Sequence, residues 1–408
     1  MELKRISELK QFYHHHLMNN IIPFWMHSDL IDREYGGFIS SVDRKGKSYN
    51  NDKSVWFQGR CLWTFSSLCN RYGKRPEWVE AATSGAKFIK DHCIDSADGR
   101  MYFVVTRDGK PLRKRRYFFS ESFLVVGFAE YYGVSGDKED LALAEKYFDL
   151  MYRLYRHPET DPFKITPKEN AEVRNLHSNA NPMVLVSSAQ TLKKVNPERK
   201  EYYNEIIYAI IDDMIGLHYK EDLQCVLENV MLDGSILDNP TGRTINPGHC
   251  IENSWFLMNQ AVQENDEELL GKALNILRWS LEIGWDKEYG GIKYFTDLYN
   301  RPCEQLEHDM KLWWVHNECL IATLLAYHLT GDAYYEQWYE KMHAYVFSHF
   351  PDEKFGEWYG YLHRDGTVSH TQKGSLWKGP YHLPRCLMLC EQILEAMEQG
   401  KRITGSLL

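Results

Sequence analysis

The chain of 408 residues repeats one pattern six times: a long, aromatic, turn-rich segment runs into a helical segment that opens with a polar side chain of catalytic type. The steps between these side chains are 61, 56, 72, 69 and 64 residues, so the spacing is nearly periodic. Such a repeat is typical of one array of similar units rather than of unrelated domains. We therefore expect a closed array in which six side chains meet at one mouth: Arg60, Glu121, His177, His249, Glu318 and His382.

Apolar residues recur at helical spacing in twelve segments, which predicts twelve helices. The links after even-numbered helices are short, as at 73–75, 134–136 and 330–331, whereas those after odd-numbered helices are about 18 to 32 residues long. Short links join antiparallel neighbours, so the long links would all lie on one face. Six such pairs predict an all-α (α/α)6 barrel, with 1–408 as one catalytic domain. The expected helices are 5–25, 54–72, 76–91, 119–133, 137–156, 175–194, 199–217, 248–264, 266–284, 311–330, 332–350 and 383–398.

Four long links carry a related turn signature, at 32–38, 97–102, 286–292 and 352–358. Each resembles a turn followed by a short strand, so short β-hairpins are expected in the long loops on one face of the barrel. The even-numbered helices would form the inner ring and point their N-termini into the cavity that the loops enclose. Helix N-termini offer unpaired N–H groups and a positive dipole end, which suits a site for hydroxyls and transient oxyanions.

Composition excludes several classes of protein. The net charge of −9 argues against a nucleic-acid surface, and the basic run at 113–116 is too short to change this. No apolar run approaches the ~20 residues needed to cross a membrane. Nine cysteines without paired spacing indicate reduced thiols, and the N-terminal segment reads as an amphipathic helix rather than a signal peptide, so we expect a cytoplasmic protein. The run at 14–16, three histidines, is expected on a solvated helix face.

His249 and Glu252 are placed by Pro247-Gly248 in the first turn of a helix, and Trp255 follows on the same face. A histidine, a carboxylate and an indole on one inward stripe suit an acid, a residue that orients it and a platform for a sugar ring. The pattern also fits a metal-binding pair, or a packed histidine beside an ordinary first-turn glutamate.

Trp314 and Glu318 are four residues apart and share a helix face. A carboxylate beside a ring is partly desolvated, which raises its pKa and suits proton handling; the alternative is a core stripe with a solvated glutamate. His382 lies between Pro380 and Pro384, just before a helix. The two prolines make this segment rigid, so His382 could serve as a catalytic base or as a structural histidine that caps the helix.

Arg60 follows Trp56-Phe57-Gln58-Gly59 in the first turns of the second helix. Its charge is permanent, so it suits an oxyanion partner or an interhelix salt bridge rather than a base. His177 lies in the polar segment 175–181 and could bind hydroxyls. The sequence has no Gly-rich phosphate loop, dinucleotide fingerprint, Cys-x-x-Cys zinc pair or Gly-x-Ser-x-Gly elbow, and no metal site is predicted.

Five motifs together resemble the N-acylglucosamine 2-epimerase family, which includes cellobiose and mannobiose 2-epimerases and some aldose–ketose isomerases. The match covers nearly the whole chain, and the family fold is an (α/α)6 barrel. The motifs are Trp56-Phe57-Gln58-Gly59-Arg60, Phe119-Ser120-Glu121-Ser122-Phe123, Asn246-Pro247-Gly248-His249-x-Ile251-Glu252, Leu312-Trp313-Trp314-x-His316-x-Glu318 and Lys378-Gly379-x-x-His382-x-Pro384-Arg385.

The resemblance implies proton exchange at C2 of a ring-opened sugar through a planar cis-enediolate. This needs two proton carriers on opposite faces of the sugar, and histidines titrate in the right range. His249 and His382 would be that pair and Arg60 would stabilise the oxyanion. Glu252 and Glu318 would orient the histidines and tune their basicity. The expected sugar-binding side chains are Trp255, Trp314, His177, Glu121 and Asn179.

Within the family, we expect an enzyme that interconverts N-acyl-D-glucosamine and N-acyl-D-mannosamine. The alternatives are a cellobiose, mannobiose or free-aldose 2-epimerase and an aldose–ketose isomerase. Outside it, a glycoside hydrolase on the same barrel would want two carboxylates facing one bond, and a non-catalytic binding protein would not need both histidines. No cofactor is required by this chemistry. The resemblance also suggests a homodimer and leaves activation by a nucleotide open.

Overall fold

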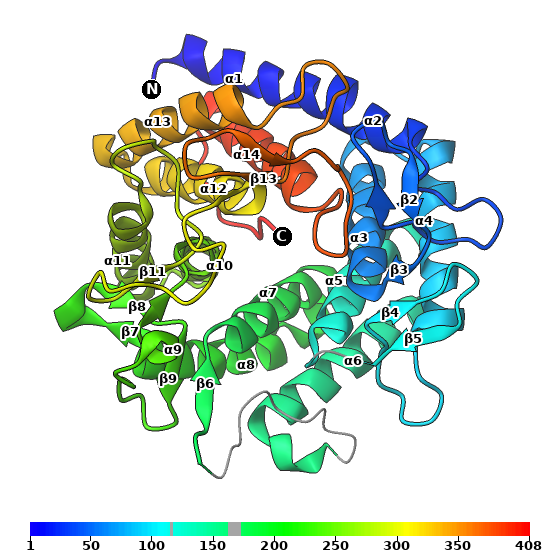
Figure 1. Cartoon of the computed structure of the whole chain (residues 1–408), viewed down its shortest axis with the longest axis horizontal. Coiled ribbons are helices and arrows are strands. Elements are labelled where there is room, and N and C mark those ends of the chain that lie inside the picture. The colour runs from blue at the N-terminus through cyan, green and yellow to red at the C-terminus, as the bar shows by residue number, and fades with distance from the viewer. Residues whose placement is uncertain (115–116, 162–172) are drawn as a thin grey trace.

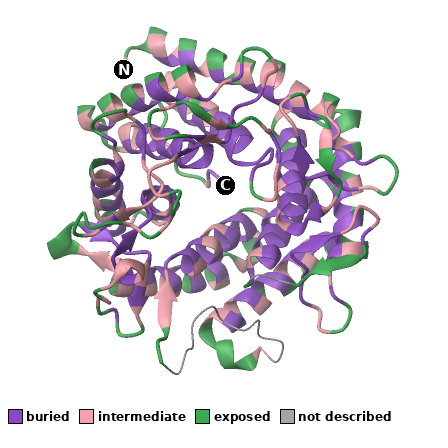
Figure 2. Cartoon of the chain, viewed as in Figure 1, coloured by how far each residue is buried: buried purple, intermediate pink, exposed green. Residues whose placement is uncertain are grey.

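Six helices form an inner ring around a central cavity in the computed structural model, which describes residues 1–114, 117–161 and 173–408 (Figure 1). Most of their side chains are buried, because each helix packs against two neighbours of the ring and an outer helix (Figure 2). A helix that is apolar on nearly all sides is expected in such a position. The inner helices are α3 Val55–Tyr72, α5 Phe119–Ser135, α7 Ala180–Val195, α10 Pro247–Glu264, α12 Trp313–Thr330 and α14 His382–Glu398.

Six further helices cover this ring and expose one face to the solvent (Figure 2). A π-helical turn continues α1 into the short helix α2, Ile22–His27. Left-handed glycines end α5 and α12, so the following outer helices turn back antiparallel. The described residues thus form the expected (α/α)6 barrel. Its outer helices are α1 Leu3–His16, α4 Pro76–Phe88, α6 Lys138–Arg156, α8 Lys200–Asp213, α11 Glu267–Gly284 and α13 Ala333–His349.

The long loops hold short antiparallel strands, as predicted, and four of the pairings are hairpins within one loop: β1–β2, β4–β5, β7–β8 and β13–β14. The others, β3–β4, β6–β9, β10–β11 and β12–β13, join neighbouring loops and were not predicted. The strands are β1 Ser41–Val42, β2 Ser48–Asn50, β3 Lys53–Ser54, β4 Val104–Val105, β5 Pro111–Arg113, β6 Leu176–Ser178, β7 Tyr219–Lys220, β8 Cys225–Val226, β9 Asn229–Met231, β10 Thr244–Ile245, β11 Thr296–Asp297, β12 Lys311–Leu312, β13 Tyr361–Leu362 and β14 Val368–His370.

The turn signature of the loops builds the same ion-pair clamp three times. Asp32 is buried and accepts from Lys53 of its own repeat at 2.9 Å and from Arg107 of the next loop at 2.9 Å. Burial raises the pKa of Asp32, but these hydrogen bonds outweigh it and hold the pKa at about 2. The same arrangement joins Asp286 to Lys311 and Arg364, and Asp352 to Lys373 and Arg44. Each clamp therefore ties one loop to its neighbour around the mouth.

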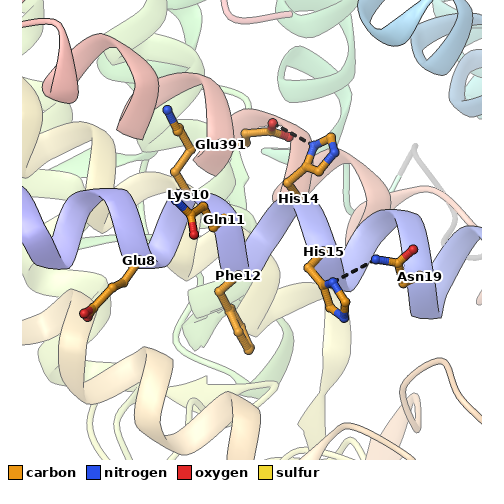
Figure 3. A pocket seen from close by; sticks show the side chains of 8 residues that line it. All are labelled: Glu8, Lys10, Gln11, Phe12, His14, His15, Asn19 and Glu391. Atoms are coloured by element: carbon orange, nitrogen blue, oxygen red, sulfur yellow. Dashed lines mark hydrogen bonds and ion pairs between the residues drawn. The ribbon is translucent and has the colours of Figure 1, made fainter.

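Several details differ from the sequence-based expectation. The segment 175–194 does not begin as a helix, because β6 pairs with β9 and α7 starts only at Ala180. Of the three histidines in α1, His14 and His15 are exposed and bond to Glu391 and Asn19 (Figure 3), whereas His16 is half-buried. Two residues of the basic run, Arg115 and Arg116, lie outside the described residues.

The C-terminal tail returns into the barrel, near the centre of the view in Figure 1. Leu407 and Leu408 are buried, and the Leu407 N–H donates to the Asn259 side chain of α10 at 2.9 Å. No helix in the described part of the chain is both long and apolar enough to cross a membrane.

Candidate active site

A cavity of about 1030 Å³ opens at the end of the barrel where the inner helices begin. Every inner helix contributes side chains from its first turns, so the helix N-termini and the loops enclose one shared site, as predicted. Of the six side chains expected to meet there, Arg60, His249 and His382 line the cavity, whereas Glu121, His177 and Glu318 do not. Aromatic rings line one part of the wall, and small polar side chains from 175–188 line another. Its charged and titratable lining includes Arg60, His249, Glu252, His382 and Arg385, and the Trp314 ring lies beside them.

His249 is the third residue of α10, and Asn246 caps this helix by accepting from the His249 N–H at 3.1 Å. Its ring Nδ1 lies 3.1 and 3.0 Å from the two carboxylate oxygens of Glu228. Burial lowers the pKa of His249, but the Glu228 carboxylate, with a further contribution from Glu252, outweighs this and raises the pKa above its ordinary value. A proton on His249 is therefore more favoured than on a free histidine, and Nε2 is the ring nitrogen without a carboxylate partner.

His382 is the first residue of α14 and has a different environment. Its Nδ1 donates to Glu318 at 2.8 Å, and Arg385 donates to the same carboxylate oxygen at 2.7 Å. Burial lowers the pKa of His382 well below its usual range, and the positive charge of Arg385 lowers it further. His382 is therefore held as a neutral imidazole, which leaves Nε2 as the ring nitrogen with a free lone pair.

Arg385 also donates to Glu252 at 2.5 Å, so one guanidinium nitrogen joins the two carboxylates. Glu252, Glu318 and His382 lie close enough to resemble a metal-binding set. Because Arg385 already occupies the space between the carboxylates and offsets part of their charge, this group fits an internal ion-pair network better than a cation site. Glu252 makes its hydrogen bond to Arg385 rather than to His249, although its charge still raises the His249 pKa, as the expected tuning of basicity requires.

The two predicted tryptophans have different positions. Trp314 lines the cavity, and its ring lies 5.5 Å from that of His249 and 5.8 Å from that of His382, so it packs beside both imidazoles. Trp255 does not form the predicted sugar-binding wall: it is fully buried, and its indole N–H donates to Glu318 at 2.9 Å. Its role is to hold the carboxylate that orients His382.

Arg60 lines the cavity and donates to the Trp377 carbonyl at 3.0 Å, with its guanidinium 4.1 Å from the Phe123 ring. Burial lowers the pKa of Arg60 to about 10, so it remains a cation at neutral pH. Among the described residues no carboxylate pairs with Arg60, and its Nε has no hydrogen-bond partner. The arginine therefore keeps donors for an oxygen of a bound molecule.

Three predicted sugar-binding residues do not line the cavity as the described residues define it. Glu121 is fully buried and bonds to Arg100 at 2.7 Å. Asn179 is also fully buried. His177 lies on β6 with its ring turned away, bonded to His218 at 2.7 Å and to Tyr155 at 3.2 Å. The periodicity placed Glu121 and His177 near the mouth, but it could not show that Arg100 binds Glu121 or that strand pairing turns His177 away from the cavity.

Sequence reasoning missed Glu228 and gave no role to Arg385. Glu228 lies in an irregular segment between β8 and β9, where no periodicity points to it. Arg385 does carry a signal, because it lies three residues after His382 on the same helix face, but only the fold shows that two carboxylates from other helices meet it.

The site can be compared with known proteins. A sequence model of the N-acylglucosamine 2-epimerase family matches residues 37–386. N-acylglucosamine 2-epimerase of Mus musculus is 35% identical over 387 residues, covering 94% of this chain and 91% of the mouse protein. Cellobiose 2-epimerase of Dictyoglomus turgidum is 28% identical over 416 residues, covering 95% and 100%.

Solved structures show the same fold. Cellobiose 2-epimerase of Spirochaeta thermophila superposes with a TM-score of 0.82 at 20% identity, covering 97% of this chain and 98% of that one. A D-mannose isomerase gives a TM-score of 0.79 at 19% identity, covering 95% and 97%. With this fold, these relatives and two histidines in one cavity, the chain belongs to the N-acylglucosamine 2-epimerase family and is an epimerase.

Proposed function

We propose that the protein interconverts N-acyl-D-glucosamine and N-acyl-D-mannosamine by exchanging the proton at C2 of the ring-opened sugar. The observation that carries the proposal is that His249 and His382 line one cavity with opposite preferences for a proton. The names of the relatives, which are 35% identical over most of the chain, support this choice of substrate.

In this mechanism the neutral Nε2 of His382 removes the C2 proton next to the aldehyde, and the planar enediolate-type anion receives a proton from His249 Nε2 on its other face. Glu318 keeps the His382 proton on Nδ1, which leaves the lone pair on Nε2. A proton on His249 also disfavours one on His382, so the pair holds one proton between them. The reverse reaction starts from the opposite protonation state.

Arg60 is proposed to bind the oxygen at C1, where negative charge develops as the C2 proton leaves. Its cation lacks a carboxylate partner among the described ion pairs, so it is available to a developing oxyanion. Trp314, beside both imidazoles, is proposed to pack against the bound sugar without covering the faces that the two histidines need.

A disaccharide 2-epimerase is the second candidate, because the cavity of about 1030 Å³ exceeds what one monosaccharide fills. Its aromatic edge includes Trp377 and Tyr117, whose rings suit stacking of a second sugar. An aldose–ketose isomerase would use the same residues but deliver the proton to C1.

The proposed exchange needs neither a metal nor a redox cofactor, because the proton leaves and returns without a change in oxidation state. We also propose that the protein works in the cytosol as a homodimer; its nine unpaired cysteines suit a reducing compartment. Light scattering after size-exclusion chromatography tests the oligomeric state, and assays with and without ATP test activation by a nucleotide.

Proton NMR of N-acetylglucosamine incubated with the protein in D2O tests the function, with cellobiose, mannose and glucose in parallel tubes. We expect N-acetylmannosamine with deuterium at C2. The C2 epimer of cellobiose alone would transfer the assignment to a disaccharide epimerase, and a ketose would indicate an isomerase. No exchange in any of the four sugars would contradict the proposal.

A further inference from the structure

Two histidines outside the cavity form a hydrogen-bonded pair that is not explained by packing alone. His177 of β6 and His218, which ends the π-helical turn after α8, approach with Nδ1 and Nε2 2.7 Å apart. His218 is fully buried, and its own Nδ1 lies 2.8 Å from the Leu227 carbonyl. Buried imidazoles that are not used elsewhere are expected to satisfy specific polar groups.

The partners determine the direction of this chain of bonds. A carbonyl only accepts, so His218 Nδ1 carries a proton and donates to Leu227. Burial lowers the pKa of His218 to about 3, and its neutral ring therefore offers Nε2 as an acceptor for His177 Nδ1. Burial also lowers the pKa of His177, whose remaining Nε2 lies 3.2 Å from the Tyr155 hydroxyl oxygen; this hydroxyl donates its single proton to Asp213 at 3.0 Å. The bonds from His177 to His218 and from His218 to Leu227 run in one direction, and such bonds strengthen one another.

The end of this chain lies one residue from Glu228. The Leu227 N–H donates back to the His218 carbonyl at 3.1 Å, so His218 holds Leu227 through both its backbone and its side chain. Glu228 itself is held by its backbone, since its N–H donates to Thr244 and its carbonyl accepts from Asn179. Its side chain is thereby left to meet His249.

We propose that His218 is a positioning residue, with His177 as the hydrogen-bond partner of its other ring nitrogen, and that it holds the Leu227–Glu228 segment so that the Glu228 carboxylate meets His249. This role rests on the proposed use of His249 as a proton carrier. It also explains why a histidine predicted to bind sugar faces away from the cavity. Other charges near the chain are Asp213, which accepts from Tyr155 and Arg156, and Lys220 of β7.

Two substitutions of His218 separate its two nitrogens. In His218→Asn the side-chain amide takes the place of Nδ1 and keeps the bond to Leu227, whereas in His218→Gln it takes the place of Nε2 and loses that bond. Both variants remove a similar part of the buried ring, so a general loss of packing affects them alike. A His328→Gln variant controls for removal of a histidine that accepts a backbone N–H far from the cavity.

The measurement is the NMR titration of His249 in ¹³C-histidine-labelled protein, assigned by the signal that disappears in His249→Asn. We expect His218→Gln to lower the His249 pKa by about half a unit or more, because the carboxylate moves away. His218→Asn and His328→Gln should titrate like the native protein. In turnover, kcat of His218→Gln should fall about threefold with an unchanged KM, as expected for a weakened acid.

An unchanged His249 pKa in folded His218→Gln would overturn the proposal, as would an equal fall in both His218 variants. The titration needs no substrate, so its outcome is independent of the proposed function. If the native protein exchanges no C2 proton but the His249 pKa responds as expected, the positioning role stands and the proposed reaction fails.

Discussion

The surroundings of His249 and His382 differ although both residues begin inner helices of the same ring. Each lies at a positive helix end, and each has a carboxylate at Nδ1, so neither the helix dipole nor the presence of a carboxylate distinguishes them. Burial lowers the pKa of both rings, so the difference lies in the neighbouring charges. Arg385, which shares Glu318 with His382, and Arg60 lower the pKa of His382 further, whereas Glu228 and Glu252 raise that of His249 above its ordinary value. The surrounding charges thus give two similarly placed histidines opposite preferences for a proton.

Replacement of either histidine should have the largest effect. We expect His382→Asn and His249→Asn each to lower epimerisation about 10³-fold or more without unfolding the protein. If the two act on opposite faces, each variant should still exchange the C2 proton of one epimer without inverting it, and the two variants should differ in which epimer. Deuterium incorporation followed by NMR measures this. Near-normal turnover of His382→Asn would remove it from the mechanism.

Removal of the Arg385 charge should come next, because this charge distinguishes the two sites. Arg385→Gln leaves Glu252 and Glu318 buried without a cation, which should lower the free energy of unfolding by about 3–5 kcal/mol. Without the neighbouring cation, the pKa of His382 should rise. Since the base must be neutral, activity should then be lost at a higher pH on acidification. Denaturant unfolding and the pH profile of kcat measure both effects.

The matched variant Arg385→Lys keeps the charge, so it should retain most of the native pH profile. An acid limb that is the same in the native protein and in Arg385→Gln would show that Arg385 does not set the protonation of His382.

Arg60→Lys tests whether residue 60 stabilises the oxyanion. The substitution keeps a positive charge near His382, where Arg60 is the second cation besides Arg385. The ammonium keeps the charge but loses the planar fork, so we expect kcat to fall about 10²-fold while KM changes little. Steady-state kinetics in both directions measure this. Equal effects on kcat and KM would make Arg60 a group that binds the sugar equally in the ground state and the transition state.

The smallest effect on activity is expected from Glu228→Gln, which removes the carboxylate that His249 contacts through Nδ1. The raised pKa of His249 should fall by about one unit. Because His249 must be protonated to act as the acid, the basic limb of kcat should move to lower pH, with about a tenfold loss at neutral pH. An unmoved basic limb would mean that another group supplies that proton.

The sequence predicted the barrel well because its cause is local and repeated. Apolar periodicity identified the twelve long helices, and alternating link lengths put the loops on one face. Arg60, His249 and His382 reach the cavity because their place in the first two turns of a helix follows from caps or prolines nearby in the chain. The directions of Trp255, His177 and Glu228 depend instead on partners from other repeats, which the nearby sequence does not reveal.

The errors in the site have long-range causes. Trp255 shares a helix face with Glu252, but its indole bonds to Glu318 from another repeat, 63 residues away. Strand pairing between two loops turns His177 out of the cavity, and register between loops cannot be read from one loop. Glu228 reaches His249 from an irregular segment, where propensity carries no information.

The three loop clamps have a consequence for the synthesis of the chain. The clamp of Asp352 takes Arg44 from the first repeat, 308 residues earlier, and α1 pairs with α13 and α14 through Arg5–Glu340 and Lys10–Glu398. At about 5–20 residues per second, a ribosome needs about 15–60 s to supply the partner of Arg44. The first repeat therefore leaves the ribosome before its contacts with the last repeat can form. We expect a chaperone that binds nascent chains to act on α1 and the first loop until the last repeat emerges.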